Sequence, residues 1–391
     1  MSTDVALGRE SAMRSGPIDD AFATLARRPD VISFAVGAPD PALLPGDLVA
    51  SLTAAAIAKH GNTALQYGLT QGFPPLLEQA RILLGGRGIG CSPERVHIST
   101  GGSGALHNLC MAQLYPGGVV LVETPTYGPA VKVFRSHGAL VVEVASDADG
   151  MLPEALDNAL AQHDPAFVYL LPTFQNPTGR TMPAVRRAQV AEVITRRGAL
   201  VVEDDVYADL RYRGEPLPTM WSFAPDRTVY ITSLSKTLAP ALRIGIAVLP
   251  DDLLEPVLAL KQGIDMQTSA FNQAIAAEFL GTEVGAAHLS VLVKSYAAKL
   301  HTVVAALDEY FPAGFTWTEP DGGMFVWVAG PTGFDADALV VPALNRGVAF
   351  LPGSAFFAAP DAPRNAIRLS FASVPEHRIE PGIELLGGLC A

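Results

Sequence analysis

Short apolar runs rich in β-branched residues alternate with segments of helical periodicity between residues 96 and 249. The seven runs are Val96–Ser99, Val119–Glu123, Leu140–Val144, Phe167–Leu171, Leu200–Glu203, Val229–Thr232 and Ile244–Leu249. The helical segments between them are Gly104–Leu114, Gly128–His137, Pro153–His163 and Pro183–Arg197. Strands that are apolar throughout and separated by helices predict an α/β fold, with a mainly parallel seven-stranded sheet covered by helices on both faces. In such sheets ligands bind at the carboxyl ends of the strands.

The segments on either side of residues 96–249 have a different pattern of predicted helices and strands. Residues 1–30 suggest an arm with a short helix (Ile18–Arg28), followed by the apolar strand Val31–Gly37 and the helix Asp47–His60. A long helical region runs from residue 250 to 310, with a break near residues 281–285. The rest predicts a smaller α+β domain with strands Met324–Val328 and Ile367–Phe371 and helix Ala336–Asn345. We therefore divide the chain into 1–45 (arm and part of the small domain), 46–265 (large domain) and 266–391 (small domain).

Composition narrows the class of protein. The 391 residues are 49% hydrophobic and carry a net charge of −12, so binding to nucleic acid has no electrostatic support. Apolar stretches are short and interrupted, which argues against a membrane span. The N-terminus carries acids and lacks an apolar core, and the three cysteines are far apart, which favours a cytoplasmic protein. The eight histidines show no paired metal-binding spacing, so no metal is expected.

One lysine follows a β-rich run, in the segment Thr232–Gly245. Lys236 lies among hydroxyl residues, after Ser233 and Ser235, and Arg243 follows seven positions later. A lysine with a depressed pKa is a good imine-forming nucleophile, and serines with an arginine suit a phosphate. This combination fits pyridoxal phosphate (PLP), which carries an aldehyde and a phosphate. The alternative is a solvated lysine at a strand end.

Further polar motifs follow other predicted strands. Thr100–Ala105 opens a helix whose free N–H groups suit a phosphate, although an ordinary strand–helix turn has the same pattern. Tyr127 could stack on a flat ring or simply pack in the core. Asn176, within Pro172–Gly179, could donate to a phenolate oxygen, or the segment could be only a turn.

Two acidic residues end another apolar strand. Asp204 at a buried strand end needs a cationic partner, and a protonated pyridine nitrogen is one. Tyr207 could donate to the ring oxygen of the same cofactor. A metal site or a solvated turn is the alternative for the pair Asp204–Asp205. Arg368 is a single charge inside an apolar strand, where it could bind a substrate carboxylate or face the surface.

Taken together, the motifs resemble those of the fold-type I PLP-dependent aminotransferases of classes I and II. Within these, the chain is most similar to the 2-aminoadipate and kynurenine aminotransferase-like group, which is related to the effector domain of MocR-type regulators. The resemblance runs from about residue 17 to the C-terminus. It is carried by Val31–Asp40, Tyr67–Gly72, Asn176–Gly179, Asp204–Tyr207, Ser233–Lys236 with Arg243, and Arg368.

The resemblance implies a role for each matching residue. Lys236 looks like the lysine that binds the cofactor aldehyde and shuttles a proton, Asp204 like the partner of the ring nitrogen, and Tyr127 like the stacking aromatic. Asn176 and Tyr207 match the donors to the ring oxygen, and Arg368, Gly37 and Asn176 match substrate contacts. The phosphate-binding positions are Ser103, Gly104, Ser233, Ser235 and Arg243. Tyr67 matches a tyrosine that reaches the neighbouring subunit's phosphate, which implies a homodimer. Gly104 departs from the pattern, because relatives often carry a hydrogen-bonding side chain there.

The implied activity is transfer of an amino group from an L-amino acid to a 2-oxo acid such as 2-oxoglutarate, in a ping-pong cycle within amino acid metabolism, biosynthesis included. Two alternatives stay open at this point. The same cofactor chemistry could serve a lyase or an oxidative enzyme, because fold alone does not fix the reaction. A non-enzymatic sensor of the MocR type is the third interpretation.

Overall fold

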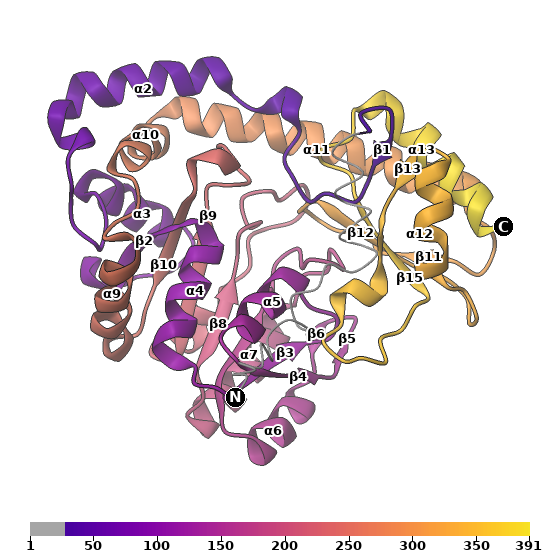
Figure 1. Ribbon diagram of the computed structural model, residues 1–391, viewed down its shortest axis with the longest axis horizontal. Coiled ribbons are helices and arrows are strands. Elements are labelled where there is room, and N and C mark those ends of the chain that lie inside the picture. Colours follow the sequence, from indigo (N-terminus) through magenta and orange to yellow (C-terminus); the bar gives the residue numbers. More distant parts are fainter. Residues whose placement is uncertain (1–27) are drawn as a thin grey trace, which may run out of the picture.

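The computed structural model describes residues 28–391, and the predicted helix Ile18–Arg28 lies largely outside them. A seven-stranded sheet forms the centre of the larger part of the molecule (Figure 1). Its strands, in spatial order, are β2 (Val96–Thr100), β10 (Ile244–Val248), β9 (Thr228–Ser233), β8 (Val201–Asp204), β7 (Pro165–Leu170), β3 (Val119–Glu123) and β4 (Leu140–Val144). All pairings are parallel except the two that β10 makes with β2 and β9. The predicted mainly parallel seven-stranded sheet is therefore confirmed.

Helices cover both faces of this sheet, as predicted. The buried residues of α4 (Gly101–Gln113), α5 (Gly128–Ser136) and α9 (Asp251–Asp265) share one core cluster with inward residues of the strands. On the opposite face, α6 (Pro153–Gln162) and α7 (Ala184–Arg197) pack on the β3–β7 half. The helices α3 (Pro74–Gly86) and α10 (Ala270–Leu280) pack on the β2–β10 half, with α2 (Gly46–His60) outside them. Because both faces are covered, the strands are apolar throughout.

The C-terminal part is built on a smaller antiparallel sheet. Its order is β11 (Thr316–Trp317), β12 (Phe325–Ala329), β15 (Ala366–Ser370) and β14 (Leu351–Pro352). Figure 1 shows α11 (Glu283–Tyr310) running from α10 to this part, where it packs against α13 (Glu376–Cys390). The helix α12 (Ala336–Asn345) matches its predicted range. The remaining elements are β1 (Ile32–Ser33), η2 (Pro41–Leu43), η3 (Gly61–Leu65), η4 (Pro93–Arg95), β5 (Ser146–Asp147), β6 (Gly150–Met151), α8 (Met220–Phe223), η5 (Pro240–Leu242), β13 (Val348–Ala349) and η6 (Gly353–Phe356).

The predicted strand Val31–Gly37 is shorter than expected, since only Ile32–Ser33 pairs as a strand, in parallel with Val348–Ala349. Phe34 still bonds to neighbouring main chain, since its N–H donates to Ala349 O and its carbonyl accepts from Ser370 N. The carbonyls beyond it accept from side chains instead. The carbonyl of Ala35 accepts from Arg368, and that of Gly37 accepts from Lys236. The segment leaves the ladder because its hydrogen bonds are made at the candidate site.

The predicted helical region 250–310 contains one break more than expected. Besides the break between α10 and α11, the chain leaves helical geometry after Asp265, and Met266 adopts a left-handed φ of 58°. The proposed boundary after residue 265 stays a prediction, and α10, which follows it, packs on α2 and α3. Within residues 28–391 no single helix is long and apolar enough to cross a membrane, and the pair α10–α11 meets that description only jointly, with a bend of 81°.

Candidate active site

A cavity of about 680 Å³ lies at the carboxyl edge of the large sheet, between it and the small sheet. Strands β2, β3, β7, β8 and β9 all end at this edge because they run in the same direction. The predicted site residues that line it are Gly37, Ser103, Tyr127, Asn176, Asp204, Tyr207, Ser233, Ser235, Lys236, Arg243 and Arg368. Strand order thus brings together residues far apart in the sequence. Gly104 and Tyr67 are the two predicted site residues outside this lining.

Lys236 follows β9 in a tight turn, where Leu238 N donates to Leu234 O at 2.9 Å. The turn directs the side chain into the cavity, and Nζ donates to Gly37 O at 2.8 Å. Burial, reinforced by the charges of Arg368 and Arg243, lowers the pKa of the Lys236 amine to about 8. The alternative of a solvated surface lysine is therefore wrong. A substantial share of the amine is neutral near physiological pH, as a nucleophile or base requires.

Asp204 ends β8 and is 5% exposed. Its Oδ2 accepts from Tyr169 Oη at 2.7 Å, whereas Oδ1 is buried without a hydrogen-bond partner in residues 28–391. Burial raises the pKa of the Asp204 carboxyl to about 6. A buried carboxylate oxygen without a donor is costly, so this atom calls for a cationic N–H group in the cavity.

Tyr169 is a residue that the sequence reasoning missed. It lies in β7 and is fully buried, and a buried tyrosine hydroxyl usually finds a partner. The signal was a hydroxyl-bearing aromatic in the middle of an apolar strand next to the strand that ends in Asp204. Its bond holds the carboxylate in one orientation.

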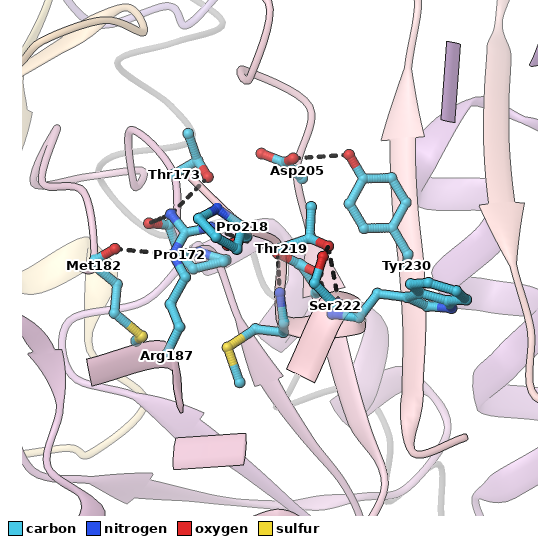
Figure 2. Close-up of polar contacts among 12 residues, drawn as sticks. Pro172, Thr173, Met182, Arg187, Asp205, Pro218, Thr219, Ser222 and Tyr230 are labelled. Atoms are coloured by element: carbon cyan, nitrogen blue, oxygen red, sulfur yellow. Dashed lines mark hydrogen bonds and ion pairs between the residues drawn. The ribbon is translucent and has the colours of Figure 1, made fainter. Parts of the chain in front are cut away.

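The neighbouring Asp205 serves another purpose. Its Oδ2 accepts from Tyr230 Oη at 2.7 Å (Figure 2). Its main-chain oxygen accepts from Thr232 Oγ1 at 2.9 Å. Arg87 Nη1 in turn donates to the hydroxyls of both Tyr230 and Thr232. The pair Asp204–Asp205 is therefore split between the cavity and a buried network, and neither a solvated turn nor a shared metal site describes it.

The residues that the sequence predicts to bind a phosphate lie near the start of α4. Ser235 N donates to Ser233 Oγ at 3.0 Å, and Arg243 Nη1 lies 3.5 Å from Ser235 Oγ. The Arg243 guanidinium packs directly over Gly101, whose φ is 74°, and a side chain there would collide with it. Together with the free N–H groups at the start of α4, these hydroxyls and the guanidinium can bind an anion.

Two predicted site residues, Gly104 and Tyr67, do not line the cavity. A side chain at Gly104 would meet Thr100 and Ser99 rather than the cavity, and Gly102 lines the cavity instead. A cofactor contact through the backbone of Gly104 therefore stays a prediction. Tyr67 is 74% exposed, and its contact with a second subunit likewise stays a prediction.

Arg368 lies in β15 and is 3% exposed, so the surface alternative for this residue is wrong. Nη1 donates to Asn176 Oδ1 at 3.2 Å and Nη2 to Ala35 O, while Nε has no partner among the described residues. Its Cζ lies 4.7 Å from the ring centre of Phe325 and 5.1 Å from that of Phe356. Burial lowers the pKa of the guanidinium to about 10. An incompletely paired, buried cation in a cavity is suited to a carboxylate ligand.

Of the two tyrosines that line the cavity, Tyr207 is buried and Tyr127 is partly buried. Burial raises the pKa of Tyr127 and that of Tyr207, so both remain neutral hydroxyl donors across physiological pH. The ring of Tyr207 packs edge-on against Phe325 at 5.4 Å, and Lys236 Nζ lies 6.0 Å from its centre. Further lining residues that the sequence reasoning did not single out are Gly128, Pro129, Lys132, Leu351, Ala355 and Phe356.

The loop that carries Asn176 is fixed from behind by Arg187, a fully buried residue of α7 (Figure 2). Its guanidinium donates to Met182 O, Pro172 O and Pro218 O at 2.8–3.0 Å and to Thr173 Oγ1 at 3.0 Å. Pro172 and Met182 are the two ends of the loop, and Met182 N also donates to Pro172 O. Arg187 therefore closes the loop that presents Asn176 to the cavity.

Replacing Arg187 with methionine should destabilise the fold by about 3 kcal/mol or more, because it leaves three buried carbonyls and the carboxylate of Glu203 without their cation. Urea unfolding followed by circular dichroism measures the change. Arg196→Met is the control on the same helix, since Arg196 is exposed and pairs with Asp157 at the surface. Equal unfolding midpoints for the two variants would contradict this role.

The fold and the cavity define a PLP enzyme of fold type I. The chain belongs to the family "Aminotransferase class I and II", whose model matches residues 29–386. It is a PLP-dependent aminotransferase, and the fold class and activity implied by the sequence resemblance are confirmed.

Relatives and solved structures are similar over nearly the whole chain. Aromatic-amino-acid aminotransferase 1 of Thermococcus litoralis is 35% identical, over 91% of this chain and 87% of the relative. The 2-aminoadipate transaminase of Thermus thermophilus is 36% identical, over 93% of this chain and 91% of the relative. The crystal structure of Pyrococcus horikoshii kynurenine aminotransferase in complex with PMP superposes with a TM-score of 0.92 at 34% identity, covering 97% of this chain and 95% of that one.

Proposed function

We propose that this aminotransferase takes its amino group from an L-amino acid with an aromatic or 2-aminoadipate-like side chain and passes it to a 2-oxo acid such as 2-oxoglutarate. The relatives named for aromatic amino acids and for 2-aminoadipate support this substrate class. The observation that carries the proposal is the combination in one cavity of Asp204 Oδ1, which has no hydrogen-bond partner within residues 28–391, and the Lys236 amine with its lowered pKa. A role in amino acid metabolism, including biosynthesis, belongs to the same proposal.

The residues of the cavity fit PLP. When bound, PLP supplies an aldehyde that bonds to amines and a protonated ring that stabilises negative charge at the substrate Cα. Asp204 Oδ1 would hold the proton on the ring nitrogen, because this oxygen lacks any other donor in residues 28–391. Tyr207 and the amide group of Asn176 would donate to the ring oxygen, and Tyr127 would pack on the ring. The hydroxyls of Ser103, Ser233 and Ser235, the Arg243 guanidinium and the N-terminus of α4 would bind the phosphate.

Two side chains act on the substrate in this proposal. Lys236 Nζ would bond to the cofactor aldehyde at rest, and then take the proton from the substrate Cα and return it. An amine with a pKa of about 8 suits both directions of this transfer near neutral pH. Arg368 would bind the α-carboxylate through the part of its guanidinium that Asn176 and Ala35 leave open. Because amino acid and 2-oxo acid share that carboxylate, one arginine serves both half-reactions.

We further propose a cytoplasmic homodimer. Leu65, Tyr67 and Leu69 are all more than half exposed, and so are Ile264 and Met266. The two segments are adjacent, because Gly68 N donates to Gln267 Oε1. An apolar surface of this kind is typical of an interface, and Tyr67 would extend from it into the partner's site. All three cysteines are free, which is in keeping with a reducing compartment.

The proposed function is tested by mixing stoichiometric enzyme, loaded with PLP, with single L-amino acids and no 2-oxo acid. We expect one equivalent of 2-oxo acid product per site from tyrosine, kynurenine or 2-aminoadipate, without ammonia, and multiple turnovers once 2-oxoglutarate is added. A lyase would release ammonia over many turnovers, and an oxidative enzyme would consume O₂. Either result, or the absence of product from every donor, would contradict the proposal.

A further inference from the structure

The segment 353–359 of the small-sheet part, which we call the η6 segment, forms one wall of the cavity. It starts at η6 and contributes Ala355 and Phe356 to the lining. The segment closely approaches the large-sheet part at Gly128, where a Cβ would lie only 2.8 Å from Ala355 O. The η6 segment thus covers the cavity by reaching across to elements of the large sheet.

Three groups of the large-sheet part bind the main chain of the η6 segment. Thr126 N donates to Phe356 O at 2.8 Å. Arg135 Nη2, from α5, donates to Ala358 O at 2.6 Å. Glu143 Oε1, from β4, accepts from Ala358 N and from Ala359 N, the latter at 3.2 Å. One side chain therefore binds a carbonyl and the other binds two amides of the same short stretch, and both bonds are charge-assisted.

The η6 segment also carries one of the two rings that flank Arg368. The ring of Phe356 is 3% exposed, lies 5.1 Å from Arg368 Cζ and packs against Trp327 at 6.1 Å. Phe325 provides the other ring, at 4.7 Å from Arg368 Cζ. Two rings around one guanidinium restrict its orientation and keep water from it, which strengthens its interaction with a carboxylate. Phe325 belongs to the β12 strand, whereas Phe356 depends on how the η6 segment is held.

We propose that Arg135 and Glu143 are positioning residues for substrate binding, because they fix the η6 segment and so hold Phe356 against Arg368. The inference rests on the proposed function in that Arg368 is taken as the carboxylate-binding residue. It adds that the affinity for both substrates is set by two surface side chains that touch neither the substrate nor the cofactor. Asp204 ends β8 and Lys236 follows β9, and neither side chain makes a hydrogen bond to the η6 segment among the described residues.

The effect should therefore fall on binding and not on chemistry. Loosening the η6 segment removes one ring from Arg368 and admits water, so KM for both amino acid and 2-oxo acid should rise. The proton transfer by Lys236 does not depend on the segment, so kcat should stay nearly constant. A general loss of structure would instead lower kcat and the amount of folded enzyme together.

The test compares Arg135→Ala and Glu143→Ala with the wild-type holoenzyme. In each variant we expect KM for 2-oxoglutarate and for the amino donor to rise about tenfold, with kcat within about twofold of the wild type. Glu143→Gln keeps an acceptor oxygen for the two amides and should restore most of the affinity. Arg81→Ala is the matched control, because Arg81 is an exposed arginine of α3 that pairs only with Glu78 among the described residues, and its KM should not change.

Hydrogen–deuterium exchange gives a measurement that does not depend on turnover. The amides of Ala358 and Ala359 should exchange faster in Glu143→Ala, and the peptide covering residues 353–359 should also exchange faster in Arg135→Ala. In the background Phe356→Ala, which should itself raise KM, adding Arg135→Ala should change KM little further, because both act through the same ring. If wild-type enzyme fails to transaminate, the proposed function fails, while the exchange data still decide whether the two residues hold the segment.

Two results with the single variants, and a third with the double variant, would overturn the inference. One is unchanged exchange in residues 353–359 of both alanine variants, which would show that the side chains do not hold the segment. The other is faster exchange with an unchanged KM for both substrates, which would show that the held segment does not set carboxylate binding. Additive KM effects in the double variant would likewise remove Phe356 as the link.

Discussion

Replacement of Lys236 with alanine is expected to lower turnover by roughly 10⁴-fold or more while the protein stays folded. The reason is that one amine carries two tasks, bonding to the cofactor aldehyde and moving the proton at the substrate Cα. Among residues 28–391, Lys132 is the only other lysine of the cavity lining, and it is an exposed residue of α5. Initial rates with 2-oxoglutarate and the best donor of the panel measure the change.

The fold should survive this substitution, because the folded protein holds the Lys236 amine at a pKa of about 8, below that of an exposed lysine. Burial therefore disfavours the protonated amine, and removing it takes away a cost that offsets the loss of its hydrogen bond to Gly37 O. The matched control is Lys59→Ala, since Lys59 is an exposed lysine that pairs with Glu278. Multiple turnovers in Lys236→Ala at more than a hundredth of the wild-type rate would remove Lys236 from its proposed role.

The lowered pKa of Lys236 also predicts how the rate of PLP uptake depends on pH. Only the neutral amine attacks an aldehyde, so the rate at which cofactor-free wild-type protein takes up PLP should rise with pH through about 8 and then level off. The visible absorbance of the bound cofactor follows this rate. Lys59→Ala should give the same profile, whereas Lys236→Ala should show no such covalent uptake at any pH.

Much of the site could be predicted because strand direction converts sequence order into spatial proximity. The residues that follow β2, β3, β7, β8 and β9 had to meet at one edge once these strands were recognised as parallel. Asp204 and Lys236 are cases in which a polar residue after an apolar run was sufficient. The reversed direction of β10 was not predicted, because an apolar run has the same periodicity in either orientation.

What could not be predicted are contacts whose partners carry no local pattern. Tyr169, which holds Asp204, looks like any aromatic in a strand, and Arg187 looks like one of several arginines on its helix. No sequence pattern around Phe356 indicates that its ring will flank Arg368. That contact depends on how the small sheet packs on the large one, which is a matter of tertiary structure. The same argument explains the shortened strand at Val31–Gly37, where side chains of the site bind the carbonyls of Ala35 and Gly37.

Asp204→Asn is expected to lower kcat by about 10²–10⁴-fold, with the cofactor still bound. The amide has nearly the same shape and its oxygen can still accept from Tyr169, so the geometry around the strand end is kept. What is lost is the negative charge that would keep the ring nitrogen protonated, and with it the ability of the ring to stabilise charge at the substrate Cα. Single-turnover rates of 2-oxo acid formation measure this step without the second half-reaction.

The neighbouring Asp205→Asn provides the control, because Asp205 lies next in the chain yet bonds to Tyr230 and away from the cavity. We expect its rate to fall less than tenfold, with the loss appearing in stability instead.

A second readout for Asp204 uses the raised pKa of its carboxyl in the ligand-free protein, about 6 compared with 3.8 in a free carboxyl. Between these values the folded state binds more protons than the unfolded state, so this group makes stability fall as pH rises from about 4 to 6. Asp204→Asn should remove that slope, whereas a variant that keeps both the slope and the wild-type rate would show that Asp204 is neither buried as described nor the partner of the ring.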